Sequence, residues 1–93
     1  MNKTESPLVT VGIPTYNRPE GLRNTLSLIT KQTHKNLQII VSDNSPSNLE
    51  SERIVREFMK EDNRIILYKQ KENIGAANNF RFLIEKAEGE YFM

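Results

Sequence analysis

The stretch Leu37-Gln38-Ile39-Ile40-Val41-Ser42-Asp43-Asn44 decides the fold of this 93-residue chain. Its first five residues are almost continuously apolar, which is typical of a strand covered on both faces, as in a parallel sheet. The residues that follow, Ser42 to Pro46, are polar turn formers. The stretch therefore predicts a buried parallel strand that ends in a polar loop.

Further strands are predicted on both sides of this stretch. Residues 8–13 form a short β-branched run that we expect Pro14 to end, and residues 64–68 form another apolar run. A fourth strand begins at Tyr91. The chain thus contains three predicted strands and the start of a fourth.

Amphipathic segments between these strands predict helices. The first begins near Pro19, because proline suits a first helical turn and Asn17 followed by Glu20 resembles a capping box. The others are expected at residues 49–60 and 75–87. Apolar spacing predicts the buried faces, which are Leu22, Leu26 and Ile29, then Ile54, Val55, Phe58 and Met59, then Ala77, Phe80, Ile84 and Ala87.

Strands that alternate with helices predict an α/β fold with a parallel sheet and right-handed crossovers. We expect a three-layer α/β/α, Rossmann-like arrangement with a partial sheet over residues 7–93. Residues 1–6 are predicted to be a disordered tail.

Composition excludes several classes of protein. Lys and Arg number 13 against 12 Asp and Glu, and this balance argues against a nucleic-acid-binding surface. The absence of cysteine excludes a disulfide scaffold and a cysteine-based zinc site. No segment approaches the ~20 apolar residues of a membrane span, and the first residues do not resemble a secretion signal. We therefore predict a cytoplasmic protein.

Polar residues follow each of the first three strands. In an open parallel sheet, ligands bind beyond the carboxyl ends of the strands, so these three loops are candidates for one site. Tyr16, after the first strand, offers an aromatic face to a flat base. Asp43, after the second, can accept hydrogen bonds from a base or a ribose hydroxyl.

The third loop leads into a helix start. Asn73 and Gly75 precede this helix, where backbone N–H groups and the helix dipole favour an anion such as phosphate. Arg18 or Lys71 can add a charge-assisted contact to the same group. The three loops together predict a nucleotide site.

Each of these signals also has a purely structural interpretation. Asn17 is either a helix cap or a ligand contact, and residues 43–46 can form an ordinary turn. Residues 73–75 can be only a helix entrance, and Tyr16 can be a packed surface aromatic. The case for a site depends on the convergence of the three loops.

The ordered set of segments resembles family 2 glycosyltransferases, which have the GT-A fold. The resemblance covers the chain from about Pro7 to Met93. It is carried by residues 9–18, by Gln32-Thr33, by residues 37–45, by the Asn73-Ile74-Gly75 helix start within residues 72–79, and by residues 87–93.

The resemblance implies a transferase that moves a sugar from a nucleotide-diphosphate sugar to an acceptor hydroxyl, with inversion, in bacterial-type glycan biosynthesis. It implies the strand order 3-2-1-4. Many members have two acids where this chain has Ser42-Asp43, and an Arg-Asn pair where it has Asn78-Asn79. The implied nucleotide-binding residues are Pro14, Thr15, Tyr16, Asn17, Arg18, Asp43, Asn73, Gly75 and Asn79.

The family's metal-binding Asp-x-Asp motif follows its fourth strand, and this sequence stops at Met93. We therefore expect a truncated fragment that contains neither the catalytic residues nor the metal ligands and is inactive alone. Mg²⁺ or Mn²⁺ is expected in the intact enzyme and not in this chain.

Two alternatives compete with this interpretation. The chain can be a small non-enzymatic α/β interaction module. A dinucleotide-binding dehydrogenase half is disfavoured, because Gly12 stands alone after the first strand and no Gly-x-Gly-x-x-Gly follows. A bare sheet edge and exposed apolar surface also predict a homo-oligomer.

Overall fold

The computed structural model describes residues 7–34 and 36–92, so the predicted tail at residues 1–6 lies outside the described residues. Strands and helices alternate as predicted. The elements are β1 (Val9–Thr15), α1 (Pro19–Ile29), β2 (Leu37–Asp43), α2 (Leu49–Glu61), β3 (Ile65–Lys69), α3 (Ala76–Lys86) and β4 (Glu90–Phe92).

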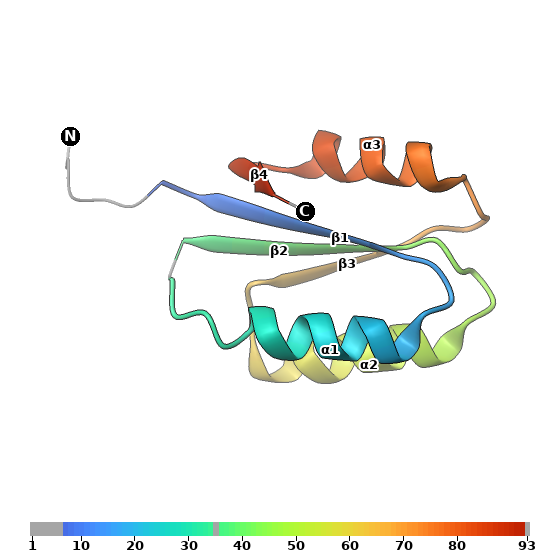
Figure 1. Cartoon of the computed structure of the whole chain (residues 1–93), viewed down its shortest axis with the longest axis horizontal. Coiled ribbons are helices and arrows are strands. Elements are labelled where there is room, and N and C mark those ends of the chain that lie inside the picture. The colour runs from blue at the N-terminus through green and yellow to red at the C-terminus, as the bar shows by residue number, and fades with distance from the viewer. Residues whose placement is uncertain (1–6, 35, 93) are drawn as a thin grey trace.

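The four strands form one parallel sheet in the order β3-β2-β1-β4, which confirms the predicted order. Helices α1 and α2 cover one face of the sheet and α3 covers the other, so the fold has the three predicted layers (Figure 1). All strands therefore end at the same edge, where the loops after β1, β2 and β3 meet.

The core lies mainly between the sheet and the α1–α2 layer. Every residue of β2 is buried, as its continuous apolar run predicts. Leu22 and Leu26 of α1 and Ile54 and Val55 of α2 pack on this face, which confirms the predicted faces of these helices. Each such side chain contributes about 1.5–3 kcal/mol when it is fully buried.

The prediction that Pro14 ends the first strand is wrong. Pro14 lies within β1 and pairs in register with Ser42. The carbonyl of Thr15 points toward β2, where it accepts from the Asn44 N–H (2.8 Å). Because successive residues of a strand point their backbone groups to opposite sides, those of Pro14 point away from β2. In the described residues β4 pairs with β1 only as far as Val11, so the missing N–H of proline costs no ladder bond there.

The predicted capping box at the start of α1 is also wrong. The N-cap is Arg18, and no side chain caps the helix. Asn17 has a φ of 50°, a left-handed conformation that asparagine tolerates. Its Oδ1 accepts from Asn48 Nδ2 at 3.3 Å, so its side chain connects two loops instead of capping a helix.

Helix α3 buries a different face from the one that apolar spacing predicted. Phe80 and Ile84 are 40% and 45% exposed, whereas Asn79 and Leu83 are buried. The Asn79 side chain exchanges hydrogen bonds with Ser42 at the end of β2. This polar anchor sets the rotation of α3, and hydrophobic periodicity does not report it.

A partly buried ion pair lies at the opposite end of the sheet, where β3 begins. Arg64 donates to Asp62 through Nε (2.8 Å) and Nη2 (2.6 Å) and to the carbonyls of Thr30, Gln32 and His34. The hydrogen bond from Arg64 lowers the pKa of the Asp62 carboxyl below its usual value. The pair ties the end of α1 to the start of β3.

Candidate functional site

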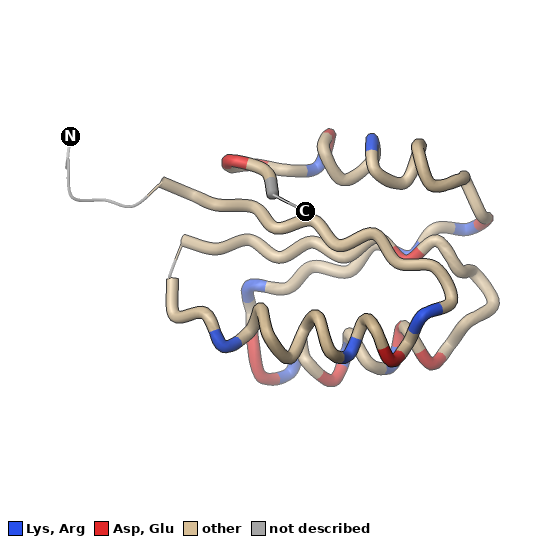
Figure 2. The backbone as a smooth tube through the Cα atoms, viewed as in Figure 1, with Lys and Arg blue, Asp and Glu red and all other residues tan. Residues whose placement is uncertain are grey.

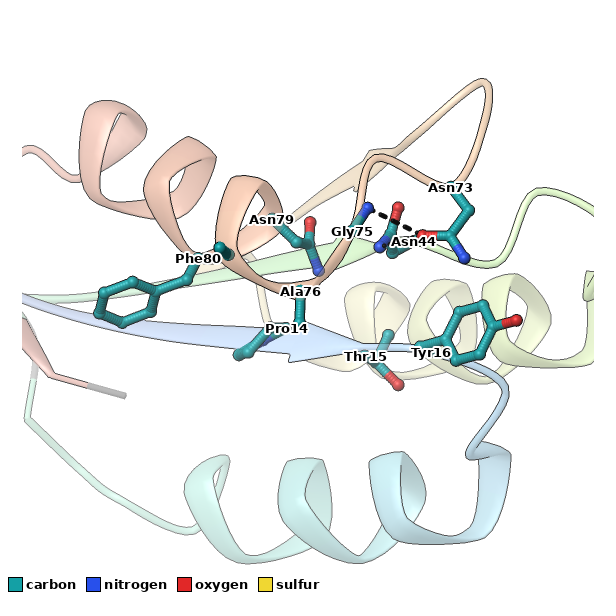
Figure 3. A pocket seen from close by; sticks show the side chains of 10 residues that line it. Pro14, Thr15, Tyr16, Asn44, Asn73, Gly75, Ala76, Asn79 and Phe80 are labelled. Carbon is teal, nitrogen blue, oxygen red and sulfur yellow. Dashed lines mark hydrogen bonds between the residues drawn. The ribbon is translucent and has the colours of Figure 1, made fainter.

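A cavity of about 730 Å³ opens where β1 and β2 end and α3 begins (Figure 3). Its volume lies within the range of roughly 300–1,000 Å³ that is typical of small-molecule sites. All three strand-end loops contribute to its wall, together with the end of β1 and the first turns of α3. The lining residues are Pro14, Thr15, Tyr16, Asn44, Asn73, Gly75, Ala76, Ala77, Asn79 and Phe80.

Tyr16 supplies the exposed aromatic surface of this cavity. It comes directly after the last residue of β1 and is 49% exposed. In Figure 3 its ring extends past the end of the strand on the side where Asn73 lies. An exposed aromatic ring offers a face on which a flat base can stack.

Two asparagines join the loops after β2 and β3. Asn44 Nδ2 donates to Asn73 Oδ1 (2.9 Å), and Asn44 Oδ1 accepts from the Ile74 N–H (2.9 Å). Asn73 Oδ1 also accepts from the Gly75 N–H at 2.9 Å (Figure 3). These contacts fix the wall of the cavity that leads into α3.

The start of α3 borders the cavity. Its N-cap, Gly75, has a φ of 85°, and no side chain caps the first turn. Ala76 and Ala77 line the cavity, and the first turn contains no acidic residue. Uncapped N–H groups and the helix dipole favour an anion at this position.

Asn79 lines the cavity from one turn further along α3. It is 3% exposed, and its Nδ2 donates to the Ser42 carbonyl at 3.2 Å. The Ser42 hydroxyl donates in turn to Asn79 Oδ1 and accepts from Gln70 Nε2 at 3.0 Å. Asn79 therefore anchors the helix while it forms part of the cavity wall.

Asp43 does not line the cavity. Its carboxylate is completely buried, and Oδ1 accepts from both the backbone N–H and the hydroxyl of Ser45. Its Oδ2 accepts from Lys69 Nζ at 3.2 Å. The next residue, Asn44, takes the position on the wall that the sequence had suggested for Asp43.

Asn17 and Arg18 lie outside this cavity as well. Arg18 lines a smaller hollow of about 340 Å³ on the α1 side, which shares Pro14, Thr15 and Tyr16 with the larger cavity. The structure therefore brings six of the predicted site residues together in one cavity. They are Pro14, Thr15, Tyr16, Asn73, Gly75 and Asn79.

Sequence reasoning missed Asn44 and Phe80 as lining residues. It expected the helix start from Gly75 to Asn79 near the ribose and diphosphate but singled out neither Ala76 nor Ala77. Asn44 carried a usable signal, because it directly follows the candidate Asp43 in a loop at a strand end. For Phe80 the sequence signal was misleading, because the helical spacing of apolar residues placed it on the buried face of the helix. Residues 7–34 and 36–92 contain no group of three or more His, Cys, Asp or Glu side chains that could hold a metal.

None of the helices in the described part of the chain has the length and apolar character needed to cross a membrane.

A mannosyltransferase structure shares this fold. The structure is PcManGT from Pyrobaculum calidifontis, in complex with GDP-Man and Mn²⁺, and it matches with a TM-score of 0.79 and 27% identity. The match covers 92% of this chain and 26% of that one.

Sequence relatives point in the same direction. An uncharacterized glycosyltransferase of Methanocaldococcus jannaschii is 33% identical over 92 residues, which cover 98% of this chain and 32% of the relative. The glycosyltransferase GlyG of Streptococcus pneumoniae is 36% identical over 86 residues, which cover 92% of this chain and 28% of GlyG. The chain thus spans about a third or less of the length of these relatives. Residues 10–93 match the family model described as glycosyl transferase family 2, and the chain belongs to this family.

Proposed function

We propose that this chain is the nucleotide-binding part of a glycosyltransferase that transfers a sugar from a nucleotide-diphosphate sugar to an acceptor hydroxyl, with inversion. One observation carries the proposal: the loops after three parallel strands wrap a single cavity of ligand size. The cytoplasmic location and bacterial-type glycan pathway belong to the same proposal and rest on the family resemblance.

The chemistry of the cavity wall suggests how a nucleotide lies in it. Tyr16 provides a stacking surface for the base at one end. The N–H groups of Ala76 and Ala77 at the start of α3 suit the diphosphate at the other end. Asn44 and Asn73 line the same cavity and offer amide groups to the base or the ribose.

The chemical step needs groups that the described residues do not supply. The complex of PcManGT with GDP-Man and Mn²⁺ supports a nucleotide sugar and a divalent metal in the intact enzyme, for which Mg²⁺ or Mn²⁺ was predicted. Residues 7–34 and 36–92 offer no cluster of ligands for such a metal. We therefore assign them binding of the nucleotide, and we assign them neither the metal nor the catalytic base.

Calorimetric titration of the chain with UDP, GDP and their sugar conjugates tests the proposal. We expect saturable binding of at least one of them, which Tyr16→Ala weakens by about fivefold or more because a stacked base is lost. Leu28→Ala is the control, since Leu28 is an exposed apolar residue on α1 and does not line the cavity. Absence of saturable binding to the unmodified chain would refute retained nucleotide binding.

We also propose that the chain self-associates. Helix α3 exposes Phe80 and Ile84, and β3 and β4 are the outer strands of the described sheet. Exposed apolar side chains and open strand edges both favour association. Light scattering that shows only monomers at high concentration would contradict this part of the proposal.

A further inference from the structure

Lys69, the last residue of β3, lies at the centre of a polar network beside the cavity. Its Nζ lies 3.2 Å from Asp43 Oδ2, 3.1 Å from the Ser45 carbonyl and 3.0 Å from the Asn48 carbonyl. Glu52 Oε1 of α2 is 3.9 Å away. One ammonium group thus contacts the end of β2, the loop after β2 and the first turns of α2.

This network is built around a buried charge. The Asp43 side chain is completely buried and that of Lys69 is 22% exposed. Charged residues lie mostly on the helices and loops, and β1 carries none, while Asp43 is the one charge of β2 (Figure 2). A buried carboxylate is costly without a partner, so Asp43 requires Lys69 for its own stability.

The loop that Lys69 holds connects to both of the other loops at the cavity. At its start, Asn44 donates to Asn73 and accepts from the Ile74 N–H. At its end, Asn48 Nδ2 donates to Asn17 in the loop after β1. A displacement of residues 44–48 would therefore disturb the contacts to the loops after β1 and β3.

We propose that Lys69 is a positioning residue of the nucleotide site. Lys69 does not line the cavity; it pins residues 43–48 and so holds Asn44 and Asn73 in place on the cavity wall. Asp43 is the buried partner of Lys69 in this network. This inference rests on the nucleotide-binding function proposed above.

Lys69→Met, which removes the charge and keeps most of the stem, tests the positioning role without any ligand. Amide hydrogen exchange should accelerate by about tenfold or more at Asn44, Ser45 and Ile74, relative to the slowest-exchanging core amides. Arg64→Met is the matched control, because Arg64 also joins a carboxylate, the partly buried Asp62, to several carbonyls, but at the opposite end of the strands. The control should leave these amides unchanged, and equal protection in Lys69→Met and the unmodified chain would overturn the proposal.

Nucleotide affinity supplies the second readout. Titration with UDP and GDP should show that Lys69→Met weakens binding by about fivefold or more, the lower end of typical coupling between linked sites. Arg64→Met should bind as the unmodified chain does. Unchanged affinity in Lys69→Met, alongside measurable binding by the unmodified chain, would refute a role in the site.

A double variant guards against simple loss of folding. Asp43→Asn combined with Lys69→Met leaves no unpaired buried charge, so it should recover most of the stability that Lys69→Met loses. It should still exchange rapidly at Asn44 and Ile74 and bind nucleotide weakly, because the loop is no longer tethered. Full recovery of both properties would show that Lys69 only neutralises Asp43. If the unmodified chain binds neither nucleotide, the proposed function fails, while the exchange data still decide the positioning role.

Discussion

Asn44→Ala should destabilise the chain and release the loop that leads into α3. Asn44 is 3% exposed, and its side chain makes two hydrogen bonds of 2.9 Å, to Asn73 Oδ1 and from the Ile74 N–H. Each buried hydrogen bond contributes about 0.5–1.5 kcal/mol, so the loss of both should lower the free energy of unfolding by about 1–3 kcal/mol. In a domain of this size, the midpoint of thermal unfolding should fall by about 4–8 °C per kcal/mol.

Urea denaturation measures this change, and hydrogen exchange at Ile74 locates it. Asn78→Ala is the control, because Asn78 makes one hydrogen bond, to the carbonyl of Ile74 (2.9 Å), from an exposed position on α3. Its substitution should change the free energy of unfolding by no more than about 0.5 kcal/mol. The reasoning is refuted if Asn44→Ala costs no more than the control, or if it destabilises the chain without faster exchange at Ile74.

Three further predictions concern other parts of the chain. Gly12→Ala should cost about 1–3 kcal/mol in a denaturation measurement, because the added Cβ would lie 2.5 Å from the Tyr91 ring; a neutral result would mean that this ring moves freely. Asp62→Asn should make the free energy of unfolding less dependent on pH in the acid range. Because the hydrogen bond from Arg64 lowers the pKa of Asp62, the carboxylate stabilises the fold at neutral pH, and this stabilisation is lost as the pH falls below about 4. Urea denaturation of the variant and the unmodified chain at about pH 5 and pH 2 checks this prediction. An equal loss of stability between the two pH values in both proteins would contradict it. Asn48→Ala should destabilise by about 1 kcal/mol, since its Oδ1 caps two amides of α2, and circular dichroism with urea measures the loss; an unchanged midpoint would exclude the cap.

Much of the fold follows from local patterns in the sequence. The continuous apolar run at residues 37–41 predicts a doubly covered strand, and all of β2 is buried. The spacing of Leu22 and Leu26 predicts the face of α1 that packs on the sheet. Because parallel strands end at one edge, the same patterns also predict that Tyr16 and Gly75 lie at one cavity, which they do.

The wrong predictions for α3 and Pro14 share one cause, which is that contacts between residues far apart in the sequence decide the outcome. The rotation of α3 depends on Asn79 and Ser42, which are 37 positions apart, and apolar spacing alone wrongly placed Phe80 in the core. Pro14 stays within β1 because of what lies beside the strand and not because of its neighbours in the chain.

The sequence by itself determined which segments become strands and helices and which loops meet at the edge of the sheet, since periodicity and turn chemistry act over a few residues. Only the tertiary structure decided which side chains face the cavity. Lys69 reaches back 26 positions to Asp43 and draws its carboxylate into the interior, and Asn44 takes the place on the wall. Whether Asp43 or Asn44 faces the cavity depends on the cost of burying a charge and on where the partner of that charge lies. No local sequence pattern encodes this.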